Sequence, residues 1–442
     1  MPSQFRPDLA SFVRALTVRE PLRVTIGTSA ARAPDKREIV EAMVHTLPAS
    51  VVLGTATSAT QIEGGCSTID WWEFAREPGR VAGGDVPDVA CDHWSRFRED
   101  VALQSRLGMA AHRMSVEWGR IEPAEGRFDD GALDRYREET ALLRSCGIEP
   151  MVTLHHFSFP TWLARRGGAT ARDFPERFES FARRVARALA DHVTLWITIN
   201  EPNVLVAQGY LLGAWPPASN DPSALVRALA GLRRAHAAAY RALHAEAPNA
   251  RVGIAHHIRL ATPATRRLRD RAAARVLDAA FNRPFLDLPQ DYIGLNYYSR
   301  DVVRFAPRKP RELFALRGVA PGCERNDLGW EIYPEGLGVA LRALARKGKP
   351  IWITENGIAD AADARRAKFI VDHLREVARA VADGVDVRGY LHWSLLDNFE
   401  WAEGYAPRFG LYAVDYATQE RTLRPSGEAY ARIAATRTLP PA

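Results

Sequence analysis

The stretch Thr198-Ile199-Asn200-Glu201-Pro202 follows a short apolar run rich in β-forming residues, so it places a carboxylate at the end of an expected strand. A second stretch of the same design, Thr354-Glu355-Asn356-Gly357, follows another apolar run far along the chain. In parallel α/β architectures the carboxyl ends of the strands carry the reactive groups. Only tertiary folding can bring Glu201 and Glu355 together, and we expect them to face each other across one bond of a substrate.

From residue 50 onward, short apolar runs alternate with longer amphipathic runs, which is typical of repeated strand and helix units. The predicted strands lie at 51–56, 111–116, 149–154, 193–199, 251–256, 291–296, 351–354 and 388–394. Helices are predicted between them at 95–107, 131–146, 175–190, 222–246, 335–347 and 363–382. Eight such units in about 390 residues fit a single (β/α)8 TIM barrel with the two glutamates at the ends of strands 4 and 7. The alternative, a doubly wound sheet, needs a Gly-rich phosphate loop, which the glycine pairs at 64–65 and 83–84 do not form.

The first 49 residues do not share this alternation. The runs 11–16 and 38–44 have helical spacing, but no residue there suggests chemistry. We therefore predict two regions, an N-terminal extension at 1–49 that is helical or partly disordered and a (β/α)8 domain at 50–442.

The composition disfavours several classes of protein. Apolar residues make up 47% of the chain and charged residues 25%, as in soluble globular proteins. The net charge is +6, but the basic residues are scattered, whereas a nucleic-acid site needs them clustered. No run is long enough to span a membrane, and the N-terminus lacks the apolar core of a secretory signal. We expect a cytoplasmic protein that binds neither nucleic acid nor membranes.

The four cysteines are widely spaced and form no CxxC pair, which disfavours a disulfide framework or a structural zinc site. We therefore expect reduced thiols and no bound metal.

The predicted strand ends carry more polar and aromatic side chains than a barrel needs for stability. Gln61 follows the first strand, Arg113 lies in the second, and His155-His156 follow the third. Asn296-Tyr297-Tyr298 end the sixth strand, and Trp393 lies in the eighth. Aromatic platforms beside amides, imidazoles and carboxylates suit a sugar, because its C–H faces stack on rings and its hydroxyls need fixed donors and acceptors.

These motifs together resemble glycoside hydrolase family 1, the retaining β-glycosidases, and more closely its archaeal-type β-glycosidase branch. The resemblance covers roughly residues 51–436, and the order and spacing of the whole set make it specific. The matching motifs are GTATSATQIEG (54–64), DWW (70–72), VEWGRIEP (116–123), TINEPNV (198–204), GLNYYSR (294–300), GCERN (322–326), GWEIYPEGL (329–337), TENGIADAAD (354–363) and GYLHWSLLDNFEW (389–401).

The resemblance implies a TIM barrel that uses no metal and no organic cofactor. It implies that Glu201 is the general acid/base and that Glu355 is the nucleophile. Matching positions imply that the substrate-binding residues are Gln61, His156, Asn200, Tyr298, Trp393, Glu400, Trp401 and Phe409. Arg113 and Asn296 fall where the family holds groups that support the catalytic carboxylates.

The chain also departs from the family pattern. Leu53, Phe157 and Asn203 stand where many members have tryptophan, although Asn203 is shared by the archaeal-type branch. The stretches 257–290 and 300–328 look short for the family. Both are expected over the aglycone entrance, so we predict a wider and more open mouth.

Retaining hydrolysis needs two carboxyl groups about 5–5.5 Å apart. One is ionised and attacks the anomeric carbon, and the other is protonated and serves the leaving oxygen. Arg113 beside Glu355 is expected to favour the anion of that carboxyl, and the Tyr298 hydroxyl could donate to it. Asn200 could bond the sugar 2-hydroxyl.

We therefore predict a retaining exo-β-glycosidase that hydrolyses β-glucosides, and also β-galactosides and β-fucosides, through a covalent glycosyl-enzyme intermediate. The expected partners are small β-glycosides or short oligosaccharides, and a homo-oligomer is a possible assembly. Transglycosylation shares the intermediate, so the sequence cannot separate it from hydrolysis. The sequence also leaves open the preferred aglycone and the ratio of glucoside to galactoside cleavage.

Two competing functions are disfavoured by particular residues. In a phospho-glycosidase a phosphate would lie where Glu400 stands, and the carboxylate would repel it. In a non-catalytic sugar-binding protein one catalytic glutamate is usually lost, whereas this chain has both Glu201 and Glu355.

Overall fold

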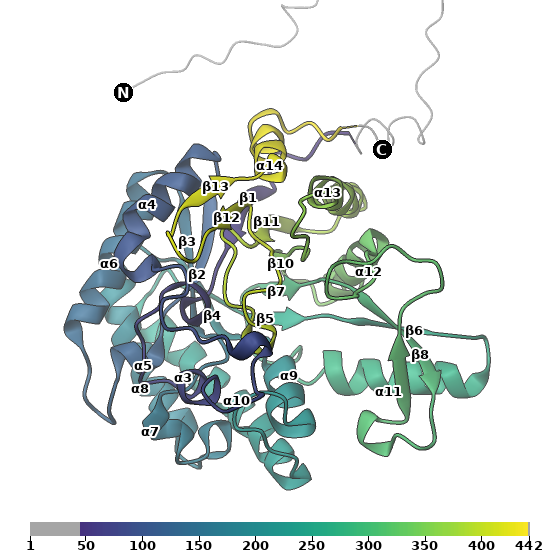
Figure 1. Ribbon diagram of the computed structural model, residues 1–442, viewed down its shortest axis with the longest axis horizontal. Helices are drawn as coiled ribbons and strands as arrows, with labels where there is room; N and C mark the ends of the chain where they lie inside the picture. Colours follow the sequence, from purple (N-terminus) through teal and green to yellow (C-terminus); the bar gives the residue numbers. More distant parts are fainter. Residues whose placement is uncertain (1–44, 441–442) are drawn as a thin grey trace, which may run out of the picture. The chain divides into compact units, whose positions relative to one another are not determined.

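A closed barrel of eight parallel strands forms the centre of the computed structural model, which describes residues 45–440 (Figure 1). Around the barrel the strand order is β1-β11-β10-β7-β5-β4-β3-β2. The barrel strands are β1 (Val52–Ala56), β2 (Ala111–Ser115), β3 (Glu149–His155), β4 (Leu195–Asn200), β5 (Arg251–His257), β7 (Ile293–Asn296), β10 (Ile351–Asn356) and β11 (Val387–Trp393). Each predicted strand overlaps one of them, so the predicted (β/α)8 TIM barrel is confirmed.

The predicted extension at 1–49 lies outside the described residues except for its last positions. Among these last positions, Thr46 forms an isolated antiparallel bridge with Thr438. The boundary between the two predicted regions stays a prediction.

Helices cover the outside of the barrel (Figure 1). The long ones are α4 (His93–Arg106), α6 (Asp130–Ser145), α8 (Phe174–Leu189), α10 (Pro222–Glu246), α11 (Leu268–Asn282), α12 (Pro334–Ala345), α13 (Arg366–Ala382) and α14 (Pro425–Thr436). Short helices lie in the loops, namely α2 (Ala59–Ile62), α3 (Asp70–Phe74), α5 (Trp118–Ile121), α7 (Thr161–Ala164), α9 (Pro202–Leu205), η1 (Ala82–Gly84), η2 (Gly168–Thr170), η3 (Val206–Leu212), η4 (Pro310–Glu312) and η5 (Trp401–Glu403). Each of the six predicted helices overlaps a long helix.

Helix α8 shows why these amphipathic segments fold against the barrel. Its residues Phe174, Phe178 and Phe181 are fully buried, and their rings pack around the ring of Trp118. This spacing places them on one helical face, while the charged residues of the segment occupy the other. Pro175 stands in the first turn, where the backbone N–H that proline lacks would have no helical partner.

Two smaller sheets lie outside the barrel and were not predicted from the sequence. One is three-stranded, with β8 (Arg300–Phe305) between β6 (Leu260–Pro263) and β9 (Ala315–Gly318), and helix α11 lies beside it (Figure 1). The other pairs β12 (Tyr412–Val414) with β13 (Arg421–Leu423). These strands have three to six residues, which is too short for a clear alternation of apolar and polar positions.

Strand β4 is irregular just before Glu201. Its register against β5 shifts between Ile197 and Asn200. Thr198 contacts His236 of helix α10, outside the barrel, at 2.7 Å, whereas Asn200 accepts a hydrogen bond from Arg113, inside it, at 2.6 Å. In a regular strand two residues so spaced would share a face, so the bulge turns the end of β4 toward the barrel axis. Strand β10 has a similar shift against β7 between Ile353 and Glu355.

Gly357 follows the end of β10 and is packed against backbone. A Cβ atom at this position would lie 1.8 Å from the carbonyl oxygen of Trp393, which ends β11. We therefore expect Gly357→Ala to force the two strand ends apart and to lower the free energy of unfolding by about 1–3 kcal/mol in chemical denaturation.

Gly318→Ala is the matched control, because no atom lies within 4 Å of a Cβ atom at that position. We expect this variant to stay within about 0.5 kcal/mol of the parent. Equal stability of the two variants would show that the contact with Trp393 does not constrain the strand ends.

Candidate active site

Glu201 and Glu355 line the same cavity, which has a volume of about 610 Å³. They come from the ends of β4 and β10, where the register shifts described above turn the chain inward. The predicted site residues that line this cavity with them are Gln61, His156, Tyr298, Trp393, Glu400, Trp401 and Phe409. The folding of the barrel therefore brings together residues that are separated by up to most of the chain.

Glu355 is buried and is held by two side chains. Arg113, itself fully buried, forms an ion pair with Oε1, and the hydroxyl of Tyr298 donates to Oε2 at 2.6 Å. Burial raises the pKa of the Glu355 carboxyl to about 7, against the opposing effect of Arg113, and the neighbouring charge of Glu201 adds to the rise. Arg113 and Tyr298 thus contact Glu355 as expected. Burial raises the pKa of this carboxyl by more than these two groups lower it in the free site.

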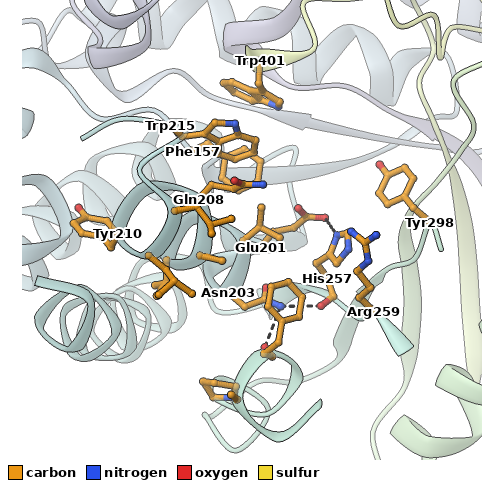
Figure 2. Close-up of a pocket in the computed structure, with 18 of the residues that line it drawn as sticks. Phe157, Glu201, Asn203, Gln208, Tyr210, Trp215, His257, Arg259, Tyr298 and Trp401 are labelled. Atoms are coloured by element: carbon orange, nitrogen blue, oxygen red, sulfur yellow. Dashed lines mark hydrogen bonds and ion pairs between the residues drawn. The ribbon is translucent and has the colours of Figure 1, made fainter. Parts of the chain in front are cut away.

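Glu201 has a different set of partners. The Nδ2 atom of Asn296 donates to Oε1 at 2.8 Å. Nδ1 of His257 contacts the same oxygen at 2.9 Å (Figure 2). Glu201 has a backbone φ of 41°, an uncommon left-handed conformation for a residue with a side chain. This conformation begins the short helix α9 directly after β4, so the local chain fixes the direction of the carboxyl group.

A chain of hydrogen bonds joins the two glutamates behind the cavity. Asn200 accepts at Oδ1 from Arg113 at 2.6 Å and from Asn296 at 3.0 Å, while Thr354 donates to Oδ1 of Asn296 at 2.6 Å. Since Arg113 contacts Glu355 and Asn296 contacts Glu201, each carboxyl is positioned by groups that also bond each other. Networks of this kind, with buried members fully bonded, hold their side chains in one arrangement.

The ring of His156 packs beside two tryptophan rings. Its ring is nearly parallel to those of Trp393 and Trp401, with centroid distances of 6.0 Å to each. Burial, together with the positive charge of Arg113, holds the pKa of His156 well below its usual range, so the imidazole is neutral. If Nδ2 of Asn200 donates to Nε2, at 3.0 Å, the ring hydrogen lies on Nδ1, which has no partner among the described residues. This Nδ1 atom is itself buried, so the ring contributes its edge and face to the cavity wall.

Gln61 and Glu400 form the polar end of the cavity. Gln61 is fully buried and donates from Nε2 to Asn398 Oδ1 at 2.9 Å, to the Phe399 carbonyl at 2.9 Å and to Glu400 Oε2 at 3.2 Å. Burial raises the pKa of Glu400 to about 8, and the charges of Glu355 and Glu201 add to this effect. Glu201, Glu355 and Glu400 therefore line one cavity together.

Aromatic rings surround this polar end. Trp401 packs against Phe157 and Trp215 at centroid distances of 5.3 Å and 5.9 Å, and the three rings lie together on one side of Glu201 (Figure 2). On another side Phe409 packs edge-on against Tyr298 at 6.2 Å. The result is a set of flat apolar surfaces around groups that can donate or accept hydrogen bonds.

Three predicted residues, Arg113, Asn200 and Asn296, are fully buried behind the cavity. Arg113 bonds Glu355, and Asn200 is linked to Glu355 through Arg113. Asn296 donates directly to Glu201. The supporting roles of Arg113 and Asn296 and the substrate-binding role of Asn200 stay predictions. In the structure the carbonyl oxygen of Asn200 accepts hydrogen bonds from Arg113 and Asn296.

The sequence did not single out His257 or Trp215. His257 ends β5, directly after a predicted strand, so the rule that strand ends carry functional groups could have found it. Trp215 lies in a loop after helix η3, and no strand or motif marks it in the sequence.

Within the described part of the chain, no group of three or more His, Cys, Asp or Glu side chains is arranged to hold a metal ion. Among residues 45–440, no helix is both long and apolar enough to cross a membrane.

Comparison with known proteins gives one consistent family. The family model of glycosyl hydrolase family 1 matches residues 43–289 and 279–439. Beta-glucosidase A of Thermotoga maritima is 34% identical over an alignment that covers 88% of this chain and 98% of that protein. A beta-galactosidase of Pyrococcus woesei is 30% identical, with 85% and 94% covered. A solved structure, the beta-glycosidase from Pyrococcus horikoshii, superimposes with a TM-score of 0.85 at 40% identity and covers 90% of this chain and 96% of that one.

The raised pKa of Glu400 predicts a pH-dependent effect on stability. In the folded chain the carboxyl keeps its proton up to about pH 8, whereas in the unfolded chain it loses it near pH 4.3. The stability linked to this proton is therefore complete below about pH 4 and is lost as the pH rises through about 8. Because Glu400→Gln is neutral at every pH, we expect its melting temperature relative to the parent to rise by roughly 2–4 °C between pH 5 and pH 9.

Glu138→Gln is the control, because Glu138 is an exposed carboxyl on α6. Its melting temperature should differ from the parent by the same amount at both pH values. A Glu400→Gln difference that is equally independent of pH would contradict the raised pKa.

Proposed function

The chain belongs to glycosyl hydrolase family 1 and is a glycoside hydrolase, and we propose that it is a retaining exo-β-glycosidase that acts through a covalent glycosyl-enzyme intermediate. The observation that carries this proposal is the unequal surroundings of two glutamates in one cavity. Glu355 is held by a cation and a hydroxyl donor, and Glu201 by an amide and an imidazole. Retaining hydrolysis needs such a division of roles between two carboxyl groups.

In the first step, the Glu355 carboxylate attacks the anomeric carbon while the bond from that carbon to the leaving oxygen breaks. Glu201 gives its proton to the leaving oxygen, so an alcohol departs and a glycosyl ester remains on Glu355. Asn296 and His257 both contact Oε1 of Glu201, which leaves Oε2 as the oxygen that carries this proton. Arg113 and Tyr298 keep the attacking carboxylate in place.

In the second step, water attacks the anomeric carbon and the ester bond to Glu355 breaks. The Glu201 carboxylate takes a proton from this water, so both glutamates return to their starting states. An alcohol in the place of water would give a new glycoside, and transglycosylation is therefore part of the proposal. Formation of the ester removes the charge of Glu355, which lessens the repulsion on the Glu201 anion and suits its change from acid to base.

The polar end of the cavity supports binding of one terminal sugar. Trp393, Trp401 and His156 offer rings to the cavity, and Glu400 can accept hydroxyl hydrogens. The two oxygens of the Glu400 carboxyl group can bond a 4-hydroxyl in either orientation, with or without a 6-hydroxyl beside it, and the protonated group can also donate to one of them. We therefore propose β-glucosides, β-galactosides and β-fucosides as substrates. Relatives named beta-glucosidase and beta-galactosidase are consistent with both epimers.

Substitution of the proposed nucleophile tests the mechanism. We expect Glu355→Ala to lower the release of phenol from an aryl β-glucoside by about 10⁴-fold or more, because no covalent intermediate can form. The parent should release the β-anomer of glucose first, as followed by ¹H NMR before mutarotation. Equal phenol release by the variant would refute the role of Glu355, and early α-anomer from the parent would refute retention.

Substitution of the proposed acid/base should move the pH profile. The attacking form of Glu355 is the anion, so kcat/KM rises as the pH rises through the pKa of this carboxyl. Part of the rise in that pKa comes from the charge of Glu201. With a dinitrophenyl β-glucoside, whose leaving group needs no proton, we expect Glu201→Gln to shift the acidic limb to lower pH by about one unit.

Glu138→Gln, remote from the cavity, should leave this limb in place. An acidic limb that stays fixed or moves to higher pH in Glu201→Gln would contradict the electrostatic coupling of the two carboxyls.

A further inference from the structure

The cavity continues beyond Glu201 into a region with very different walls, which we call the aglycone chamber. It is enclosed by helices α9, η3, α10 and α11. Its wall is made of aliphatic and aromatic side chains, among them Leu211, Leu225, Leu229, Leu277, Phe281 and Phe285. Since Glu201 is the proposed proton donor, the group that leaves with the glycosidic oxygen must occupy this chamber.

The polar side chains around the aglycone chamber are largely bonded to the protein itself. The Nδ2 atom of Asn203 donates to the backbone carbonyls of His257 at 2.8 Å and Phe281 at 3.2 Å (Figure 2). Arg259 pairs with Asp301 at 3.0 Å. His257 itself contacts Glu201. Asn203 Oδ1 and Arg259 Nε have no partner within residues 45–440, but both atoms are buried. These groups therefore offer few accessible atoms to the hydroxyl groups of a ligand.

Other charged groups at this end are also paired. Glu312 lies 2.7 Å from Lys309, and Arg317 lies 3.9 Å from Asp301. On the η3 and α10 side, the side chains of Gln208 and Asn220 have no hydrogen bond within residues 45–440, and neither has the hydroxyl of Tyr210, whose oxygen is buried. Two amides cannot satisfy the hydroxyls of a second pyranose, and each buried hydroxyl without a partner weakens binding.

The apolar surface extends outward from the buried wall. Leu212 on η3 and Val226 on α10 line the cavity and are 42% and 62% exposed. Exposed aliphatic side chains that continue a buried apolar wall mark a surface that an apolar ligand would cover. An extended aliphatic group bound in the chamber would therefore meet apolar contacts along its whole length.

We propose that the natural aglycone is an extended aliphatic alcohol, such as a long-chain or terpenoid alcohol, rather than a second sugar. This inference rests on the proposed function, because it assigns the aglycone side of the same site. The polar end near Glu400 binds the sugar, and the aglycone chamber buries the hydrocarbon that leaves as an alcohol. Each methylene buried in such a chamber strengthens transition-state binding by about three- to fourfold.

Alkyl β-glucosides test the proposal directly. We expect kcat/KM to rise from methyl to butyl to octyl β-glucoside, each measured below its critical micelle concentration, with octyl exceeding butyl by about tenfold or more. Octyl β-glucoside should also exceed cellobiose. A flat alkyl series, or a preference for cellobiose, would overturn the inference.

Variants of the rim locate the effect in the aglycone chamber. Leu212→Asp and Val226→Asp place a charge where the end of the octyl chain would lie, so we expect the octyl-to-methyl ratio of kcat/KM to fall by about fivefold or more. Val276→Asp is the matched control, because Val276 is 51% exposed on α11 and does not line the cavity. A ratio that is unchanged in both rim variants, or equally reduced in the control, would overturn the assignment.

An aryl β-glucoside separates this inference from the proposed function. Release of phenol together with a flat alkyl series would overturn the aliphatic aglycone alone. If no glycoside of any kind is cleaved, the proposed function fails, and the inference fails with it.

Discussion

The buried guanidinium of Arg113 is the constraint on which the site depends. A charge without contact to water is costly unless every donor has a partner, and Arg113 meets this need with Thr153 Oγ1 at 3.1 Å, the Thr354 carbonyl at 3.2 Å, Asn200 and Glu355. These partners belong to β3, β10 and β4, so one side chain joins three barrel strands. Glu355 can therefore be buried without leaving an unpaired cation, and Asn200 is fixed at the end of β4, one residue before Glu201. The hydrogen bonds of Arg113 inside the barrel therefore fix the ends of these strands, and with them the positions of both glutamates.

The two glutamates begin from similar sequence contexts and end in different electrostatic surroundings. Each follows a buried strand and a register shift, but Glu355 faces a fixed cation while Glu201 faces an amide and an imidazole. Burial keeps the pKa of Glu355 near 7 in the free site, despite Arg113. The low polarity that raises this pKa also strengthens the interaction of Arg113 and Tyr298 with the carboxylate once it forms. Under the proposed mechanism, Glu355 is a poorly solvated and therefore reactive nucleophile, and its bonds to Arg113 and Tyr298 hold it in place.

The sequence predicted the barrel from local patterns, and most of the cavity from those patterns together with the family resemblance. Buried strands appear as apolar runs, and polar residues at their carboxyl ends must meet at one rim. The family resemblance, rather than a local pattern, implied that residues as distant as Gln61 and Glu400 belong to one site, and both line the cavity. The sheet of β6, β8 and β9 could not be predicted, since its strands are short and half-exposed and depend on tertiary contact with α11. The contact of His257 with Glu201 depends on the path of β5 in space, which no local pattern encodes. The bulge at the end of β4 was also hidden, because Thr198 and Asn200 share a face in any regular strand.

One end of the cavity is polar and the other is apolar, and this difference affects both which glycoside binds and whether water or an alcohol reacts with the intermediate. Under the proposed mechanism, the leaving alcohol lies in the aglycone chamber after the first step, and water reaches the ester from the same side, because Gln61 and Trp393 close the other end. A sugar alcohol would find few partners on the walls near Leu277 and Phe281 and would leave quickly. An aliphatic alcohol would be retained by the same walls and would exclude water while it remained. Its hydroxyl would then lie beside Glu201, the base for the second step, so an apolar chamber that favours an aliphatic aglycone should also favour transfer of the sugar back to such alcohols.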